Sequence, residues 1–112
     1  MSIATAYAKN ELATKYGQLG GWISVHTGPP GTNGQNEAAG NGYARKQTSW
    51  GTASNGTITG SEVEIDAGAG QYVSAGLWTA QTGGTFIDTV AVVNTTLGAV
   101  GKLKVTPTYT QT

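Results

Sequence analysis

The segment Ser61-Glu62-Val63-Glu64-Ile65-Asp66 alternates acidic residues with two β-branched apolar residues. Because successive side chains of a strand point to opposite faces, this alternation predicts a strand with one solvated and one buried face. Lys102-Leu103-Lys104-Val105 alternates in the same way, with lysines in place of the acids. If the two strands pair, carboxylates would oppose ammonium groups, and each cross-strand pair would contribute about a few tenths of a kcal/mol.

Short segments rich in β-branched and aromatic residues extend this pattern along the chain, separated by Gly and Asn. The Asn-Gly pair within 54–57 and the Gly-Gly pair within 82–85 are typical of tight turns. Pro107 predicts a strand end or an edge strand, because proline cannot donate a ladder hydrogen bond. The pattern predicts strands over residues 22–27, 43–50, 62–67, 71–79, 85–93 and 102–109. This spacing favours a mainly β fold, a β-sandwich or a barrel-like antiparallel sheet over 22–109.

One segment, residues 2–17, predicts a single N-terminal helix. It carries four alanines and has no Gly or Pro before Gly17. Ser2 is the expected N-cap, and Gly17, Gly20 and Gly21 are expected to end the helix. Its apolar positions are spread over a broad arc, so the helix is weakly amphipathic and needs a partner surface.

The composition describes a neutral chain. Its 112 residues predict a single domain, 1–112. Only 11% of the residues are charged, and six basic residues balance six acidic ones. Such a surface has no field that attracts nucleic acid or an anionic membrane, so neither is an expected partner. The lack of cysteine excludes disulfides and thiolate sites. No segment resembles a signal peptide or a membrane span, so we expect synthesis in the cytoplasm.

Catalytic and metal-binding interpretations find little support. His26 is the only histidine, and without a nucleophile motif it is better interpreted as a loop-capping residue than as part of a Ser-His-Asp triad. The acids of 62–66 share a strand face, as glycosidase carboxylates would, but a solvated face explains them. The oxygen ligands within 33–37 lack calcium-loop spacing, and the loop glycines lack the lysine and helix of a phosphate-binding loop. We therefore expect no catalytic residue, no metal and no cofactor.

The segment from His26 to Tyr43 predicts a long loop rich in Gly, Asn and Pro. A connection of this length within a compact fold is uncommon and is usually functional or disordered. Its consecutive prolines stiffen one side, and its glycines permit sharp turns. A contact role is favoured over a plain surface crossover. The residues expected at its interface are Pro29, Pro30, Asn33 and Asn36.

Three tryptophans, Trp22, Trp50 and Trp78, each fall within a predicted strand. Packing in the core is the favoured interpretation, because aromatic side chains bury large apolar areas. One of them could instead be an exposed anchor for a partner.

The motifs together resemble a family of small structural proteins of tailed bacteriophages. The resemblance lies in Trp-Ile-Ser-Val-His-Thr-Gly-Pro-Pro-Gly-Thr-Asn-Gly-Gln-Asn-Glu (22–37), Gly-Asn-Gly-Tyr-Ala-Arg (40–45), Thr-Ser-Trp (48–50) and Gly-Leu-Trp-Thr-Ala-Gln-Thr-Gly-Gly-Thr-Phe (76–86). It implies a non-enzymatic virion component. Glu37, Tyr43 and Arg45 match the family's pattern, and we hypothesise that they pin the loop back on the sheet.

Three functions follow as expectations. The favoured one is a capsid decoration protein on the outside of the head, with the major capsid protein and copies of itself, as a trimer, as partners. The second is a minor tail or fibre-associated protein. The third is a glycan-binding module for host adhesion, in which Trp78 and Gln81 would contact the sugar.

Overall fold

The computed structural model describes residues 3–112. The two alternating segments form strands β4 (Val63–Ala67) and β7 (Gly101–Val105), which pair antiparallel. Glu64 lies opposite Lys104 and Asp66 opposite Lys102, whose Nζ is 2.6 Å from the Asp66 carboxylate. The cross-strand arrangement expected from the sequence is therefore confirmed. The opposite face of this pair is apolar and points into the core.

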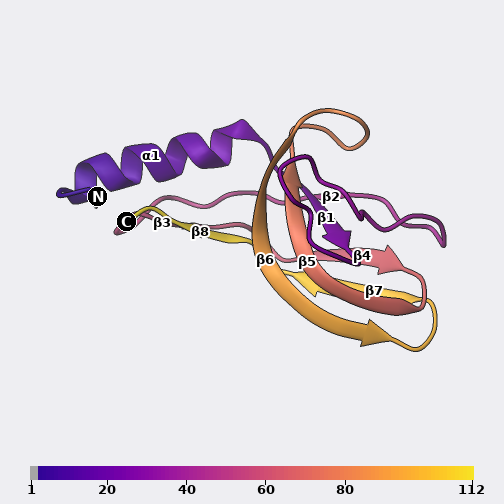
Figure 1. Ribbon diagram of the computed structural model, residues 1–112. Coiled ribbons are helices and arrows are strands. Elements are labelled where there is room, and N and C mark those ends of the chain that lie inside the picture. Colours follow the sequence, from indigo (N-terminus) through magenta and orange to yellow (C-terminus); the bar gives the residue numbers. More distant parts are fainter. Residues whose placement is uncertain (1–2) are drawn as a thin grey trace.

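A second, four-stranded antiparallel sheet packs over that apolar face (Figure 1). Its strand order is β2-β1-β5-β6. Its strands are β1 (Trp22–His26), β2 (Lys46–Gln47), β5 (Gly70–Trp78) and β6 (Phe86–Leu97). Ile23 and Val25 of β1 and Leu77 of β5 are fully buried against β4 and β7. The mainly β, antiparallel, sandwich-like fold with one helix is thus confirmed.

The four-stranded sheet is strongly curved, and β6 bends across the body (Figure 1). The pairing of β5 with β6 slips at three places, and at each place β6 has one residue more than β5. For example, Ala75 pairs with Ala91, but the next residue, Gly76, pairs with Thr89. Such bulges bend the longer strand and increase its twist. The extra residues of β6 therefore account for the curvature.

The remaining elements form an arm beside this body (Figure 1). Helix α1 (Ala6–Leu19) packs on a two-stranded sheet of β3 (Thr57–Thr59) and β8 (Thr108–Thr110). The two ends of the chain meet on the arm, where the Ile3 amide donates to the carbonyl of Thr112 at 3.2 Å. The arm makes the molecule long, with extents of 46 × 23 × 22 Å.

Tyr16 of α1 lies where the arm meets the body. Its ring stacks on Tyr109 with a centroid distance of 3.7 Å and lies edge-on to Trp50. Its hydroxyl donates to the Asp88 carboxylate of β6 at 2.8 Å. Burial and this carboxylate together raise the pKa of Tyr16 far above its ordinary value. The tyrosine therefore remains a hydrogen-bond donor across the ordinary pH range.

The helix differs from the prediction of 2–17 at both ends. Thr5 is the N-cap, and its side chain accepts from the Ala8 amide at 3.2 Å, whereas the expected cap Ser2 lies outside the described residues. Gly17 does not end the helix. It faces Trp50 and Ile58, which would lie 3.0–3.1 Å from a Cβ at that position, so the glycine lets α1 approach β3 and Trp50 closely. No helix among residues 3–112 is long and apolar enough to cross a membrane.

Two strand predictions need correction, and one strand was missed. The predicted strand 43–50 reduces to Lys46–Gln47, because the chain before it turns toward the long loop and the chain after it enters the arm. The predicted strand 102–109 is divided at Pro107 into β7 and β8. Strand β3 was not predicted. It follows the Asn-Gly turn at 55–56, where both residues have positive φ (51° and 79°), as a tight hairpin requires.

Candidate functional site

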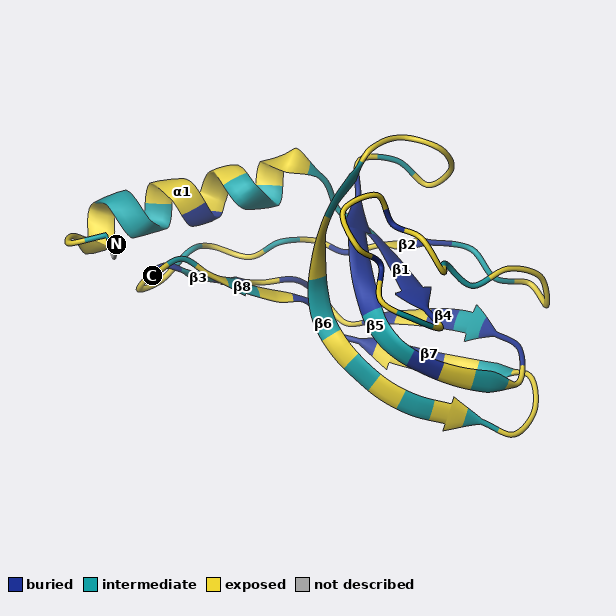
Figure 2. Ribbon diagram, in the orientation of Figure 1, coloured by how far each residue is buried: buried dark blue, intermediate teal, exposed yellow. Residues whose placement is uncertain are grey.

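Strand β1 is buried on both faces, although its outer face carries polar residues (Figure 2). Ser24 and His26 are both 0% exposed. Strands that are buried on both faces are usually apolar on both faces, as in parallel sheets. In β1 one face is polar, and a second layer of the chain covers it. That layer is the long loop, which folds back over the sheet instead of projecting from it: the Thr27 amide donates to Asn36 O, and the Ala38 amide to Val25 O.

A chain of hydrogen bonds joins the sheet to the loop. The Trp78 indole N–H donates to Ser24 Oγ at 2.9 Å, and Ser24 Oγ lies 2.6 Å from His26 Nε2. His26 Nδ1 lies 2.8 Å from the carbonyl oxygen of Gln35. Because a carbonyl only accepts, Nδ1 carries the proton, so Nε2 accepts from Ser24. His26 therefore caps the loop as the neutral tautomer, and Ser24 is its buried donor and not an accessible nucleophile.

Two glycines let the loop and the sheet approach each other around this network. A Cβ on Gly76 would lie 2.7 Å from Ser24 Oγ and 2.9 Å from His26 Nε2. A Cβ on Gly34 would overlap the Trp78 ring, and Gly34 has φ = 77°. Glycine is therefore required at both positions, and at Gly34 the backbone conformation adds to the requirement.

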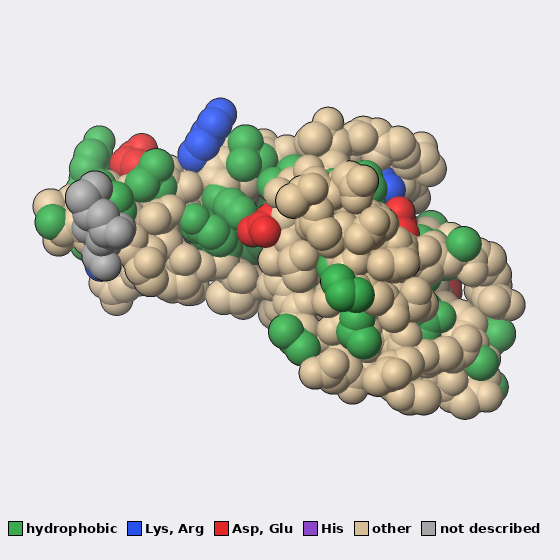
Figure 3. Space-filling view, viewed as in Figure 1, with side chains coloured by type: hydrophobic (Ala, Val, Ile, Leu, Met, Phe, Trp, Pro, Cys, Tyr) green, Lys and Arg blue, Asp and Glu red, His purple; other side chains and the backbone are tan. Residues whose placement is uncertain are grey.

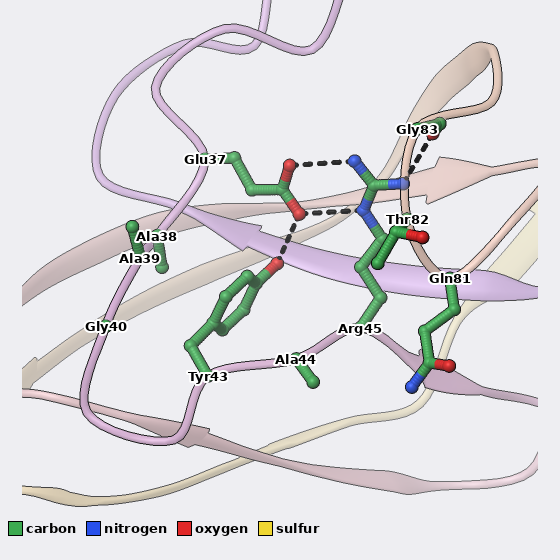
Figure 4. Close-up of a pocket in the computed structure, with 10 residues that line it drawn as sticks. All are labelled: Glu37, Ala38, Ala39, Gly40, Tyr43, Ala44, Arg45, Gln81, Thr82 and Gly83. Atoms are coloured by element: carbon green, nitrogen blue, oxygen red, sulfur yellow. Dashed lines mark hydrogen bonds and ion pairs between the residues drawn. The ribbon is translucent and has the colours of Figure 1, made fainter.

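Glu37, Tyr43 and Arg45 are in direct contact (Figure 4). Arg45 donates from Nε to Glu37 Oε2 at 2.8 Å and from Nη2 to Oε1 at 2.9 Å, a bidentate ion pair. The Tyr43 hydroxyl donates to the same Oε2 at 2.6 Å. These are the three residues hypothesised to pin the loop, and the structure brings them together.

Arg45 also contacts the turn between β5 and β6. Its Nη1 donates to the carbonyl oxygens of Ala80 and Gly83 at 3.0 and 2.8 Å. The guanidinium carbon lies 3.6 Å from the centroid of the Trp78 ring, a cation–π geometry. One side chain thus links the loop, the sheet and the 80–83 turn.

Burial and hydrogen bonding shift the pKa of Glu37 in opposite directions. Burial alone would raise the pKa of Glu37, but the hydrogen bonds from Arg45 and Tyr43 outweigh burial, so the pKa lies below its ordinary value. Burial and the bond to Glu37 raise the pKa of Tyr43. Burial also lowers the pKa of His26, against the opposing effect of its bond to Gln35 O. The cluster is therefore a charged Glu–Arg pair beside a neutral tyrosine and a neutral histidine.

Beside the ion pair lies a cavity of about 400 Å³. It is lined by residues 37–40 and 43–45 of the loop and by residues 81–83 of the turn (Figure 4). Small side chains, Ala38, Ala39 and Ala44, leave the space, and Gln81 and Thr82 stand on the opposite side. Both of these polar side chains are exposed.

The residues predicted as the loop's interface differ in exposure. Pro29 and Asn33 are exposed, whereas Pro30 is buried and cannot contact a partner. Asn36 is exposed, but its amide donates to the carbonyl of Pro29 at 3.0 Å and its φ is 63°, so it shapes the loop from within.

The tryptophan expected to contact a glycan is not available. Trp78 is only 8% exposed, because Arg45 covers its ring face and Phe86 packs edge-on against it. Trp22 and Trp50 are partly buried. Gln81 remains accessible at the cavity.

The contribution of the 80–83 turn was not foreseen. A turn at 82–85 was predicted from its glycines, but nothing in the local sequence indicates that its carbonyls bind Arg45, which lies 35 and 38 residues away. Among residues 3–112, no group of three or more acidic or histidine side chains is arranged to hold a metal.

Comparison with known proteins identifies the family. The family described as podophage GP4 fiber I protein gp80 matches residues 5–106. The chain belongs to this family. It is therefore a phage structural protein of a virion-associated fibre family, not a family known for catalysis. No curated protein and no solved structure matches the chain significantly.

Proposed function

We propose that the chain is a fibre-associated subunit of a podophage tail. The observation that carries this proposal is the match of residues 5–106 to a family described as a fibre protein. The match covers helix α1, strand β3 and the strands of the body, and it ends before strand β8 of the arm. The family description supports a fibre-associated role at least as well as decoration of the head, which was the favoured expectation from the sequence.

The shape and surface of the molecule fit a subunit that works in an assembly. The arm carries large exposed apolar side chains, Tyr7 at 76%, Leu12 at 45% and Leu19 at 45%. Figure 3 shows apolar side chains gathered along this arm, with few charges beside them. A neutral, sparsely charged surface opposes association only weakly. Copies of the chain, as a trimer, are the proposed partners through the arm.

The test is a cryo-electron microscopy map of the source particle. We expect density for the 46 × 23 × 22 Å molecule at the tail, on or beside a fibre. Immunogold labelling of intact particles with an antibody against this chain gives an independent location. Density or label confined to the capsid surface would overturn the proposal and would support the alternative, a decoration protein bound to the major capsid protein.

A further inference from the structure

The cavity between the loop and the 81–83 turn lies beside the Glu37–Arg45 ion pair. Its walls are held by Arg45, whose side chain is 8% exposed and bonded to both the loop and the turn. Its volume of about 400 Å³ falls within the range of small-molecule sites. Because Arg45 fixes both the loop and the turn, the cavity is a preformed site. The side chains that line it indicate which ligand it would bind.

Charge limits the ligand to a neutral molecule. Four of the five N–H groups of Arg45 are used, two on Glu37 and two on backbone carbonyls, so the guanidinium has little capacity left for an anion. The Glu37 carboxylate accepts three hydrogen bonds, two of them from Arg45. The charges of the pair cancel at the cavity wall, so neither an anion nor a cation gains from entering.

The remaining lining is amphipathic. Ala39 and Ala44 offer small apolar contacts on the loop side. Gln81 and Thr82 supply an amide and a hydroxyl, which both donate and accept. Both side chains are exposed, and neither forms a hydrogen bond with another of residues 3–112 in the structure. A matching ligand needs an apolar face and several hydroxyl groups that donate and accept.

We propose that this cavity binds one neutral pyranose unit of a glycan. The C–H face of the sugar packs on Tyr43 and the alanines, and its hydroxyls bond to Gln81 and Thr82. This ligand class goes beyond the proposed function, which concerns a place on the particle. It also differs from the glycan site expected from the sequence, because Trp78 lies behind Arg45 and takes no part.

The proposal is tested by saturation-transfer NMR on the full chain with methyl glycosides of glucose, galactose, N-acetylglucosamine and rhamnose. We expect at least one of them to bind with a millimolar dissociation constant, and free glucosamine and N-acetylneuraminic acid, which are charged, not to bind. Gln81→Ala/Thr82→Ala should weaken binding at least about tenfold, because two hydrogen bonds are lost. Ala39→Phe should abolish binding by filling the cavity.

The matched control is Gln71→Ala/Thr96→Ala. These residues have the same side chains, are exposed, and lie opposite each other on β5 and β6; binding should be unchanged. The proposal is overturned if none of the four glycosides binds at about 20 mM, if a charged sugar binds more tightly, or if both double variants bind equally well. Because the assay uses the isolated chain, its result is independent of where the protein sits on the particle.

Discussion

Arg45 holds the site through contacts with chain segments far apart in sequence. It pairs with Glu37, caps two carbonyls of the 80–83 turn and covers Trp78. A lysine has the same charge but lacks the planar fork that serves a carboxylate and two carbonyls together. The stability of the site therefore depends on the hydrogen-bonding geometry of the Arg45 guanidinium more than on its positive charge.

Arg45→Ala should lower the free energy of unfolding by about 3 kcal/mol, because it leaves a partly buried carboxylate without its partner. Arg45→Lys should recover less than half of that loss. Chemical denaturation measures both values, and limited proteolysis should cut the loop between 27 and 44 faster in the alanine variant. Equal stability of the wild type and Arg45→Ala, with equal cleavage rates, would refute the pinning hypothesis.

The glycines of the loop offer a second test. Gly34 and Gly40 have nearly the same φ, 77° and 75°, but only Gly34 lies against Trp78. Gly40→Ala should cost about 1 kcal/mol, from backbone strain alone. Gly34→Ala should cost about 1–3 kcal/mol more, because its Cβ overlaps the indole. Thermal unfolding compares them, and equal losses would show that the loop does not pack on Trp78.

Acid should destabilise the protein. The pKa values of His26 and Glu37 are both lowered by folding, so below their ordinary values of 6.5 and 4.5 the unfolded chain binds more protons. Their stabilising contributions are complete above these values and are lost as the pH falls through the lowered pKa values.

The unfolding free energy between pH 7 and pH 3 measures this effect. We expect a steady fall below about pH 6.5, with a steeper fall below about pH 4.5. Glu37→Gln should remove most of the steeper part and leave only the effect of the exposed Asp66, whose pKa the hydrogen bond from Lys102 also lowers. Glu11→Gln, on the exposed surface of α1, is the control. A wild-type profile that is flat down to pH 4 would contradict the assignment.

Strand β6 determines the shape of the sheet at the scale of elements. Its three additional residues relative to β5 bend it, and Asn94 has φ = 47° at one of these positions. The same bulges break the regular row of backbone groups on this edge strand, and such irregularity discourages unwanted pairing with other chains.

Asn94→Val should cost about 1–3 kcal/mol, because a β-branched residue is strained at positive φ. Asn94→Gly should be nearly neutral, since glycine adopts this conformation freely. Thr96→Val, which introduces the same side chain at an exposed position of β6, is the control and should change stability little. Circular dichroism melting curves compare the three variants. Equal melting temperatures for Asn94→Val and Asn94→Gly would mean that the bulge does not require a positive φ at Asn94.

Elements whose pattern is local were predictable from the sequence. The alternation of 61–66 and 102–105 gave the β4–β7 pair and its charged register, and the Asn-Gly pair gave the turn at 55–56. Elements fixed by distant contacts were not predictable. Gly17 resembles a helix end, but α1 continues past it because Ile58 and Trp50 pack there. The segment 43–50 has strand-forming residues, yet only Lys46–Gln47 form a strand, because the residues before it hold the loop and those after it enter the arm.

The residues of the candidate site also fall into those that the sequence indicated and those that depend on distant contacts. The trio Glu37, Tyr43 and Arg45 was singled out through the family resemblance, and the loop through its length. The partners of Arg45 on the 80–83 turn and the covered position of Trp78 depend on how the loop folds back, which no local pattern encodes. Pro30 illustrates the limit, because a proline in a loop is usually exposed and here it is buried.

In the proposed roles, the arm of the molecule serves assembly and the body carries the cavity. Leu12 and Leu19 are seven residues apart on α1 and so share a face of the exposed helix. Their contact with a second copy would bury apolar surface that is now in water.

Native mass spectrometry of the purified chain should therefore show a species of three times the 11.4 kDa chain mass. Leu12→Glu/Leu19→Glu should shift it to the monomer, because charges at an apolar contact are costly to bury. Gln18→Glu adds a charge at an exposed position of the same helix and should leave the mass unchanged. A monomer in the wild type at all concentrations would remove the trimer from the proposal.

The meeting of Ile3 and Thr112 on the arm has a practical consequence for engineering. Two chain ends that lie side by side allow a fold to be inserted into a surface loop of another protein, with short linkers and little strain. A scaffold protein would then hold this chain by its arm and leave the body, with its cavity, free on the outside (Figure 1). The same geometry would allow many copies to be displayed on one particle for measurements of weak, multivalent adhesion.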